Sequence, residues 1–249
     1  MTQVTLKTIE QNDNVGMFSI CFDGNSESEF EKFLMEFKDN ATYNKDFNAI
    51  LLALSKIIDK GALERFFRIE GRMNDHVSAL SIDSRKLRLY CLRISDQILI
   101  LGNGGVKLSR TYQENEKLSG YVMDLQTFDK VLLKAQENGI ITIEKNMITD
   151  IESATFERLS IMIQNKLFRD CLAAIPAEQK AEFDLSFGIA ERISEILKAK
   201  GLTQKDFARL LNKRDSEISK WLTGRHNFTT QTIARIETAL GSKLISIAH

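Results

Sequence analysis

The sequence has few residues that could cross-link the chain or hold a metal. Its 249 residues include only three cysteines and one proline. Cys21, Cys91 and Cys171 are odd in number, lie far apart, and have no Cys-x-x-Cys spacing or histidine partner, so neither a disulfide framework nor a zinc site is expected. We therefore predict three buried thiols and no metal or other cofactor.

Long hydrophobic segments are also missing. There is no apolar run of about 18 residues, and Met1–Lys7 is polar with no signal core, so we expect a cytoplasmic protein without a membrane contact. The sequence also lacks a glycine-rich phosphate loop and a nucleophile elbow, which argues against a cofactor-dependent metabolic enzyme. What is present is a hydrophobic content of 43%, enough for one large or two modest folded domains.

Charge is unevenly distributed, although the net charge is zero. Residues 186–249 contain 11 basic and 6 acidic residues, whereas the first 185 residues contain 23 basic and 28 acidic residues. A basic excess at one end of a chain indicates contact with nucleic acid at that end. Whether residues 186–249 bind nucleic acid is then judged from the sequence motifs in that segment.

The first half alternates helical and strand-like patterns. Val15–Phe22 is an apolar run, and helices are expected at Ser26–Phe37, Tyr43–Asp59 and from about Leu125 to Asn138. Period-two patterns predict an antiparallel meander, interrupted by a hairpin turn at Gly102–Gly105, and then a small hairpin. These strands are Val77–Ile82, Leu87–Ile94, Ile98–Leu101, Val106–Ser109, Ile140–Glu144 and Met147–Asp150. This half is predicted to be an α+β domain with an antiparallel sheet.

The second half is predicted to be all helical. Thr155–Ala173 is amphipathic, Pro176 suits the first turn of a helix, and Phe187–Lys200 forms a further helix that ends at Gly201. With a boundary between Asp150 and Phe156, we predict three parts. They are an α+β domain at 1–152, a helical linker at 153–185 and a helical domain at 186–249.

The last domain carries a helix-turn-helix pattern. Thr203 and Asp206 are spaced as a capping box, and Ala208 is small where the next helix must approach. Asn212 suits a left-handed turn, and the next helix is Ser216–Leu222, with a further helix capped by Thr229.

This segment, from Leu202-Thr203-Gln204 to Trp221-Leu222-Thr223-Gly224, resembles lambda-repressor-like (xenobiotic-response-element) helix-turn-helix proteins, and most of all the HigA-like antitoxin branch. Asn212 stands where the family usually has glycine. The resemblance implies that Ser216–Leu222 lies in the major groove of operator DNA. Base contacts are then expected from Arg214, Ser216, Glu217 and Lys220, and phosphate contacts from Gln204, Arg225 and Asn227.

The α+β domain has a resemblance of its own. The segment Lys86–Arg93, the strand Ile98–Leu101 and the run from Gly104 to Tyr112 resemble the sheet of RelE/HigB-type toxins, over about residues 63–134. That resemblance implies metal-independent cleavage of ribosome-bound mRNA by attack of a ribose 2′-OH. Alternation puts Arg88 and Tyr90 on one face of their strand, and a polar sheet face is expected. The candidate catalytic residues are Arg88, Tyr90, Lys107, Arg110 and Tyr112; Leu108 replaces a lysine typical of such toxins.

Together the two resemblances suggest a toxin-antitoxin pair fused into one chain. We expect a DNA-binding autorepressor that acts as a homodimer or larger homo-oligomer on an inverted repeat, with a neutralised or lost nuclease activity. The linker would cover the toxin-like domain with Phe156, Leu159, Ile163 and Leu167. The alternative is a single-component regulator whose first domain binds a small ligand or dimerises; a deep apolar pocket would favour a sensor, and a shallow cationic sheet face would favour a toxin.

Overall fold

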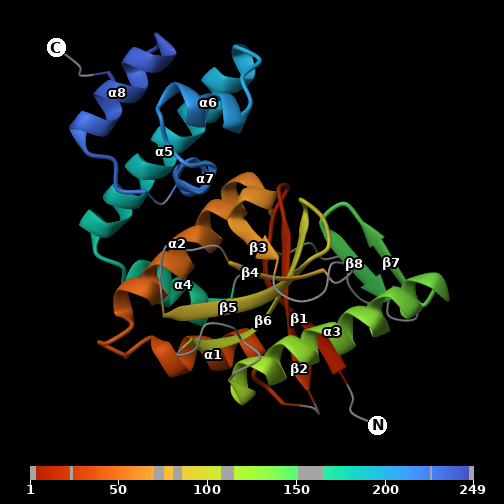
Figure 1. Ribbon diagram of the computed structural model, residues 1–249. Coiled ribbons are helices and arrows are strands. Elements are labelled where there is room, and N and C mark those ends of the chain that lie inside the picture. Colours follow the sequence, from red (N-terminus) through yellow and green to blue (C-terminus); the bar gives the residue numbers. More distant parts are fainter. Residues whose placement is uncertain are drawn as a thin grey trace. The chain divides into compact units, whose positions relative to one another are not determined.

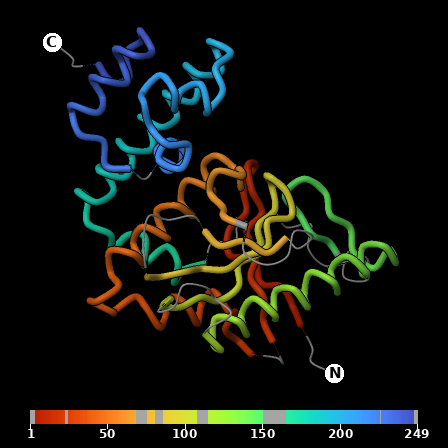
Figure 2. Tube along the Cα trace, viewed as in Figure 1, coloured from red at the N-terminus to blue at the C-terminus, as the bar shows by residue number. Residues whose placement is uncertain are grey.

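The computed structural model describes residues 4–22, 25–69, 76–80, 86–107, 115–150, 165–224 and 226–246. The chain forms two compact units, Met1–Ala174 and Ile175–His249, which are drawn as ribbons in Figure 1 and as a Cα tube in Figure 2. Unit 1 contains the sheets, and unit 2 is helical. The division falls after Ala174, whereas the sequence placed the end of the first domain near residue 152.

Unit 1 is built on a six-stranded sheet with the order β1-β2-β6-β5-β4-β3. The strands are β1 (Val4–Gln11), β2 (Gly16–Phe22), β3 (Phe67–Ile69), β4 (Val77–Leu80), β5 (Leu87–Arg93) and β6 (Ile98–Val106). The prediction of an α+β unit is confirmed, and the meander pairs β4–β5 and β5–β6 are antiparallel as predicted, but the sheet as a whole is mixed because β2 and β6 pair in parallel. Two helices, α1 (Glu29–Phe37) and α2 (Asn44–Lys60), follow β2 before the chain returns to the sheet, and such a connection permits a parallel pair.

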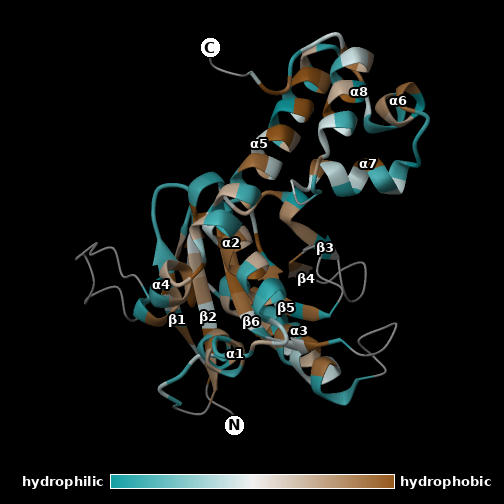
Figure 3. Ribbon diagram, turned by 90° about the vertical axis from the view of Figure 1, so that its left-hand side faces the viewer, coloured by the Kyte–Doolittle hydropathy of each residue, from teal (hydrophilic) through white to brown (hydrophobic). Residues whose placement is uncertain are grey.

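Helices cover both faces of this sheet. Phe18 and Ile20 of β2 pack toward α3 (Glu116–Glu137), which contributes Leu118, Val122 and Leu125 to the same core. On the opposite face, the Ser19 hydroxyl donates to the carbonyl of Leu101 and accepts from the backbone N–H of Phe30 at the start of α1. Figure 3 shows hydrophobic residues gathered on the central strands. Burial on both faces explains why β2 and β6 are nearly continuous apolar runs.

β6 is one strand from Ile98 to Val106, so the hairpin turn predicted at Gly102–Gly105 is wrong. The glycines are explained by close packing inside the strand. A Cβ on Gly102 would lie 2.9 Å from Leu125, and one on Gly105 would lie 3.2 Å from Leu118, both on α3. A Cβ on Gly104 would lie only 2.0 Å from the carbonyl oxygen of Arg88. These positions let a helix and a neighbouring strand approach β6 closely.

The remaining elements of unit 1 agree more closely with the sequence. A short helix, η1 (Glu64–Phe66), precedes β3, and the hairpin of β7 (Ile141–Glu144) and β8 (Met147–Asp150) is confirmed. α3 begins nine residues earlier than predicted, because the Asn115 side chain caps it by accepting from the backbone N–H of Leu118.

α4 (Lys166–Ala173) belongs to unit 1, although the sequence placed it in the linker. Asn165 caps it at the backbone N–H of Phe168 and donates to Glu31 at 2.8 Å. Phe168 is fully buried and packs edge-on against Phe30. Arg169 pairs with Glu10, so α4 is attached to the sheet and to α1. Leu167 is partly buried, and the predicted covering residues Phe156, Leu159 and Ile163 lie outside the described residues.

Unit 2 contains four helices in the described range: α5 (Ala177–Ala199), α6 (Gln204–Leu210), α7 (Asp215–Leu222) and α8 (Thr230–Leu240). α5 is a single helix that starts right after Pro176, where the sequence indicated two separate segments. Its second half packs with the other three helices around one core, which includes Ile193, Phe207, Ile218 and Ile236. The predicted helical domain is therefore confirmed.

Replacing Gly104 by alanine should destabilise unit 1 by roughly 2–4 kcal/mol, because the new Cβ would overlap the backbone oxygen of Arg88. Gly105→Ala is the matched control: its Cβ would meet only the movable end of Leu118, and the cost should stay below about 1 kcal/mol. Urea unfolding followed by circular dichroism measures both. Equal losses for the two variants would contradict the close approach at Gly104.

Candidate nucleic-acid interface

α6 and α7 form a helix-turn-helix whose turn is fixed by local hydrogen bonds. Asp206 accepts from the backbone N–H of Thr203 at 3.0 Å, and the Thr203 hydroxyl accepts from the backbone N–H of Asp206, as the predicted capping box requires. At the other end of α6, Asn212 has a φ of 52°, which confirms the predicted left-handed turn. The backbone N–H of Lys213 then bonds to the carbonyl of Ala208 at 2.9 Å and closes the helix.

Gln204 links the starts of the two helices. Its side-chain amide donates to the carbonyl of Asp215 at 3.1 Å, which joins the first residue of α6 to the first residue of α7. Gln204 thus helps to hold the N-terminal end of α7 in place. Its predicted contact with a phosphate stays a prediction.

The two faces of α7 differ sharply. Ile218 and Trp221 are buried in the core of unit 2, while Ser216, Ser219 and Lys220 are exposed. These three exposed residues share one face because positions three and four apart are neighbours on a helix. The sequence reasoning missed Ser219, which its spacing from Ser216 could have identified. In the described part of the chain, no hydrogen bond or ion pair engages the Lys220 side chain.

Glu217 serves the structure of the turn. Its carboxylate accepts from Lys213 Nζ at 3.0 Å and from the backbone N–H of Arg214 at 3.2 Å. These hydrogen bonds hold the pKa of Glu217 below its usual range. Arg214 is the N-cap residue of α7 and is exposed beside Ser216, as a base-reading residue would need to be.

The loop after α7 is held by aromatic packing. The Trp221 ring lies 5.3 Å from His226 in a stacked arrangement and 5.9 Å from Phe228 in an edge arrangement, measured between ring centroids. Asn227, between them, is exposed. The sequence reasoning did not identify the roles of His226 and Phe228. Arg225, the other predicted phosphate contact in this loop, lies outside the described residues.

Of the candidate catalytic residues that the structure describes, Arg88 and Tyr90 lie on a sheet face that a helix covers. Tyr90 is fully buried in the core beneath α3, so the prediction that it lies on an accessible polar face is wrong. Alternation did place Arg88 correctly on the same side as Tyr90, because Arg88 pairs with Gly105, which faces Leu118 of α3. That side is covered by the helix.

Of the other candidate catalytic residues, two are partly buried and two lie outside the described residues. Arg88 is partly buried and donates through Nη1 to the carbonyl of Leu87 at 3.0 Å. Lys107 is partly buried, and its backbone N–H bonds to the carbonyl of Lys86. Arg110 and Tyr112 lie outside the described residues.

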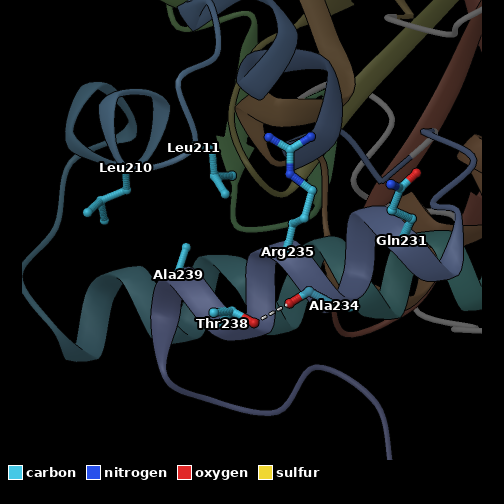
Figure 4. Close-up of a pocket in the computed structure, with 7 residues that line it drawn as sticks. All are labelled: Leu210, Leu211, Gln231, Ala234, Arg235, Thr238 and Ala239. Atoms are coloured by element: carbon cyan, nitrogen blue, oxygen red, sulfur yellow. Dashed lines mark hydrogen bonds between the residues drawn. The ribbon is translucent and has the colours of Figure 1, made fainter.

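A groove of about 390 Å³ lies between α6 and α8. Figure 4 shows Leu210 and Leu211 on one side of it, with Arg235 and Ala239 of α8 on the other. None of its lining residues belongs to α7 or to the predicted DNA contacts. The groove is therefore a separate surface of unit 2.

Residues 193–246 match a family of helix-turn-helix domains of the lambda-repressor-like type. No curated protein matches the chain. Within the described residues, no helix is long and apolar enough to span a lipid bilayer, and no cluster of three or more His, Cys, Asp or Glu side chains is arranged to hold a metal. The family match and the helix geometry identify unit 2 as a DNA-binding domain of a transcription regulator.

The stability of unit 2 should decrease at acid pH. Hydrogen bonds from Thr203, Lys213 and Lys243 lower the folded-state pKa values of Asp206, Glu217 and Glu237 respectively. A lowered folded pKa contributes stability above the unfolded pKa, and this stability is lost as pH falls through the folded pKa. Because Trp221 is the only tryptophan, its fluorescence reports urea unfolding of this unit.

The urea concentration at the unfolding midpoint should decrease as the pH is lowered from about 6 to about 3. Glu217→Gln should make this decrease smaller. The effect will be modest because the carboxylates of Asp206 and Glu217 are solvent-screened. A midpoint that is constant over this range would contradict the role of these carboxylates.

Proposed function

We propose that the chain is a sequence-specific transcriptional repressor that reads DNA with α7. The observation that carries this proposal is the division of α7 into a buried face and an exposed face. Ile218 and Trp221 are buried and fix the orientation of α7. Ser216, Ser219 and Lys220 on the opposite side of the helix therefore point to solvent. A lysine can donate to guanine O6 and N7, and serine can bond to either a donor or an acceptor on a base edge. Arg214, exposed at the start of α7, would add a second cation near the bases.

Phosphate contacts would fix the position of α7 in the groove. Asn227 and the start of α6 at Gln204 carry exposed polar groups on either side of α7 in sequence. Such contacts determine register on the duplex and carry little base information. A single domain of this size has a small DNA interface, so the repressor would act as a homodimer on an inverted repeat, with half-sites about one helical turn apart.

Lys220→Ala should weaken binding to the preferred duplex by roughly 1–3 kcal/mol and relax base preference at one position. The preferred duplex is first selected from a randomised library with the full chain, and binding is then measured by fluorescence anisotropy. Lys243→Ala is the matched control, since it removes an exposed positive charge that Glu237 already pairs. If Lys220→Ala bound the selected duplex as tightly as the unaltered chain, the assignment of α7 as the reading helix would be wrong.

We further propose that the protein is of toxin-antitoxin type and represses its own gene, with a RelE/HigB-like first unit that is catalytically inactive. The resemblance of residues 63–134 to such toxins supports the relationship. Two observations favour inactivity. α3 covers the sheet face that carries Arg88 and Tyr90, and Leu108 replaces a lysine typical of the family.

Ribosome-bound mRNA incubated with the full chain should therefore remain intact. Primer extension on the mRNA detects cleavage, and Arg88→Ala is the matched variant. Cleavage by the unaltered chain that disappears in Arg88→Ala would contradict the proposed inactivity and would show that Arg88 acts in a nuclease site.

The second candidate function is a single-component regulator whose first unit dimerises. The exposed face of α3, described below, favours a dimerising role for unit 1, whether or not this unit is related to RelE/HigB-type toxins.

A further inference from the structure

The outward side of α3 exposes large apolar side chains among charged ones. Met123 is 61% exposed and Val131 is 55% exposed, while the opposite face is buried by Leu118, Val122 and Leu125. Of the nine large hydrophobic residues exposed in the described chain, five lie in α3 or in the hairpin segment after it. Concentrated exposure of this kind marks interaction surfaces more often than scattered single residues do.

The exposed face contains a regular line of residues, which we call the α3 seam. Its members follow one another at alternating intervals of four and three residues, and each is exposed or partly exposed. They are Glu116, Gly120, Met123, Thr127, Lys130 and Lys134. This spacing keeps side chains on one line along a helix and is the spacing by which helices pair.

Gly120 has no explanation within the described chain. A Cβ at this position would meet no atom within 4 Å, so nothing there requires a glycine. Glycine inside a helix is destabilising relative to alanine. Close approach of another helix is a physical reason to place glycine on an outward face.

The charges of the seam are self-complementary. Glu116 is at the first turn and Lys134 at the last; they are 18 positions apart, which corresponds to five turns at about 3.6 residues per turn, so both lie on the same line. In the described residues, neither side chain forms an ion pair. The seam is also symmetric about position 125: Glu116 and Lys134, Gly120 and Lys130, and Met123 and Thr127 are equidistant from it.

We propose that the α3 seam is a homodimer interface, in which α3 of a second copy packs antiparallel across a two-fold axis at position 125. Each Glu116 then faces Lys134 of the other copy, and each Met123 packs against Thr127. The absent side chain of Gly120 leaves room for the long stem of Lys130. A two-fold interface requires a surface that complements itself, and this symmetric seam meets that requirement.

This inference rests on the proposed dimeric state and names its surface, but it does not depend on DNA binding. Sedimentation velocity of the full chain without DNA, over a concentration series, should show a monomer–dimer equilibrium. Glu116→Lys and Lys134→Glu each place like charges together twice per dimer, and each should weaken dimerisation about tenfold. The double variant Glu116→Lys/Lys134→Glu restores opposite charges and should return the dissociation constant to within about threefold of the unaltered value.

Met123→Asp should weaken the dimer more than either charge reversal does, because it places two carboxylates beside the axis. Leu133→Asp is the matched control: Leu133 is exposed on α3 but lies off the seam, so its dissociation constant should be unchanged. Circular dichroism confirms that each variant is folded. A monomer at all concentrations, or a double variant as weak as the single ones, would overturn the interface. Neither outcome would affect the Lys220 test of DNA binding.

Discussion

The candidate interface depends on the contact between α6 and α7. Ala208 is 1% exposed, and its small side chain allows α7 to approach α6 closely enough for Ile218 and Trp221 to be buried. The left-handed turn at Asn212 sets the direction in which α7 leaves. Because that packing fixes one face of α7, the other face is fixed as well. The exposed polar residues of α7 are thus positioned by buried apolar contacts that would not themselves touch DNA.

In unit 1 the corresponding constraint is burial of the sheet on both sides. α3 covers one face, and α1 packs on the other through Ser19 and Phe30. A sheet enclosed in this way has no broad polar face in the described region, which is why Tyr90 lies in the core. Its helices instead offer their outward surfaces, and that of α3 carries exposed Met123 and Val131 among charged residues.

The sequence predicted unit 2 better than unit 1, for identifiable reasons. Local signals determine most of unit 2: the capping box at Thr203, the turn at Asn212 and the alternation of apolar positions along α7 are all visible within a few residues. The bond of Glu217 to the Arg214 backbone is not visible in its residue type, and its predicted base contact stays a prediction. In unit 1 the glycines of β6 were read as a turn. Their actual role depends on Leu118, Leu125 and Arg88, which lie elsewhere in the sequence, and so does the parallel pairing of β2 with β6.

The attachment of α4 changes where the protein can be divided. Asn165 bonds to the carbonyl of Ile9 and to Glu31, and Phe168 fills the space beside Phe30. A fragment that ended near residue 152 would lose this helix, expose an aromatic surface on α1 and leave the buried Glu10 without its arginine. The compact first unit therefore extends to Ala174, some twenty residues into the segment that the sequence assigned to the linker.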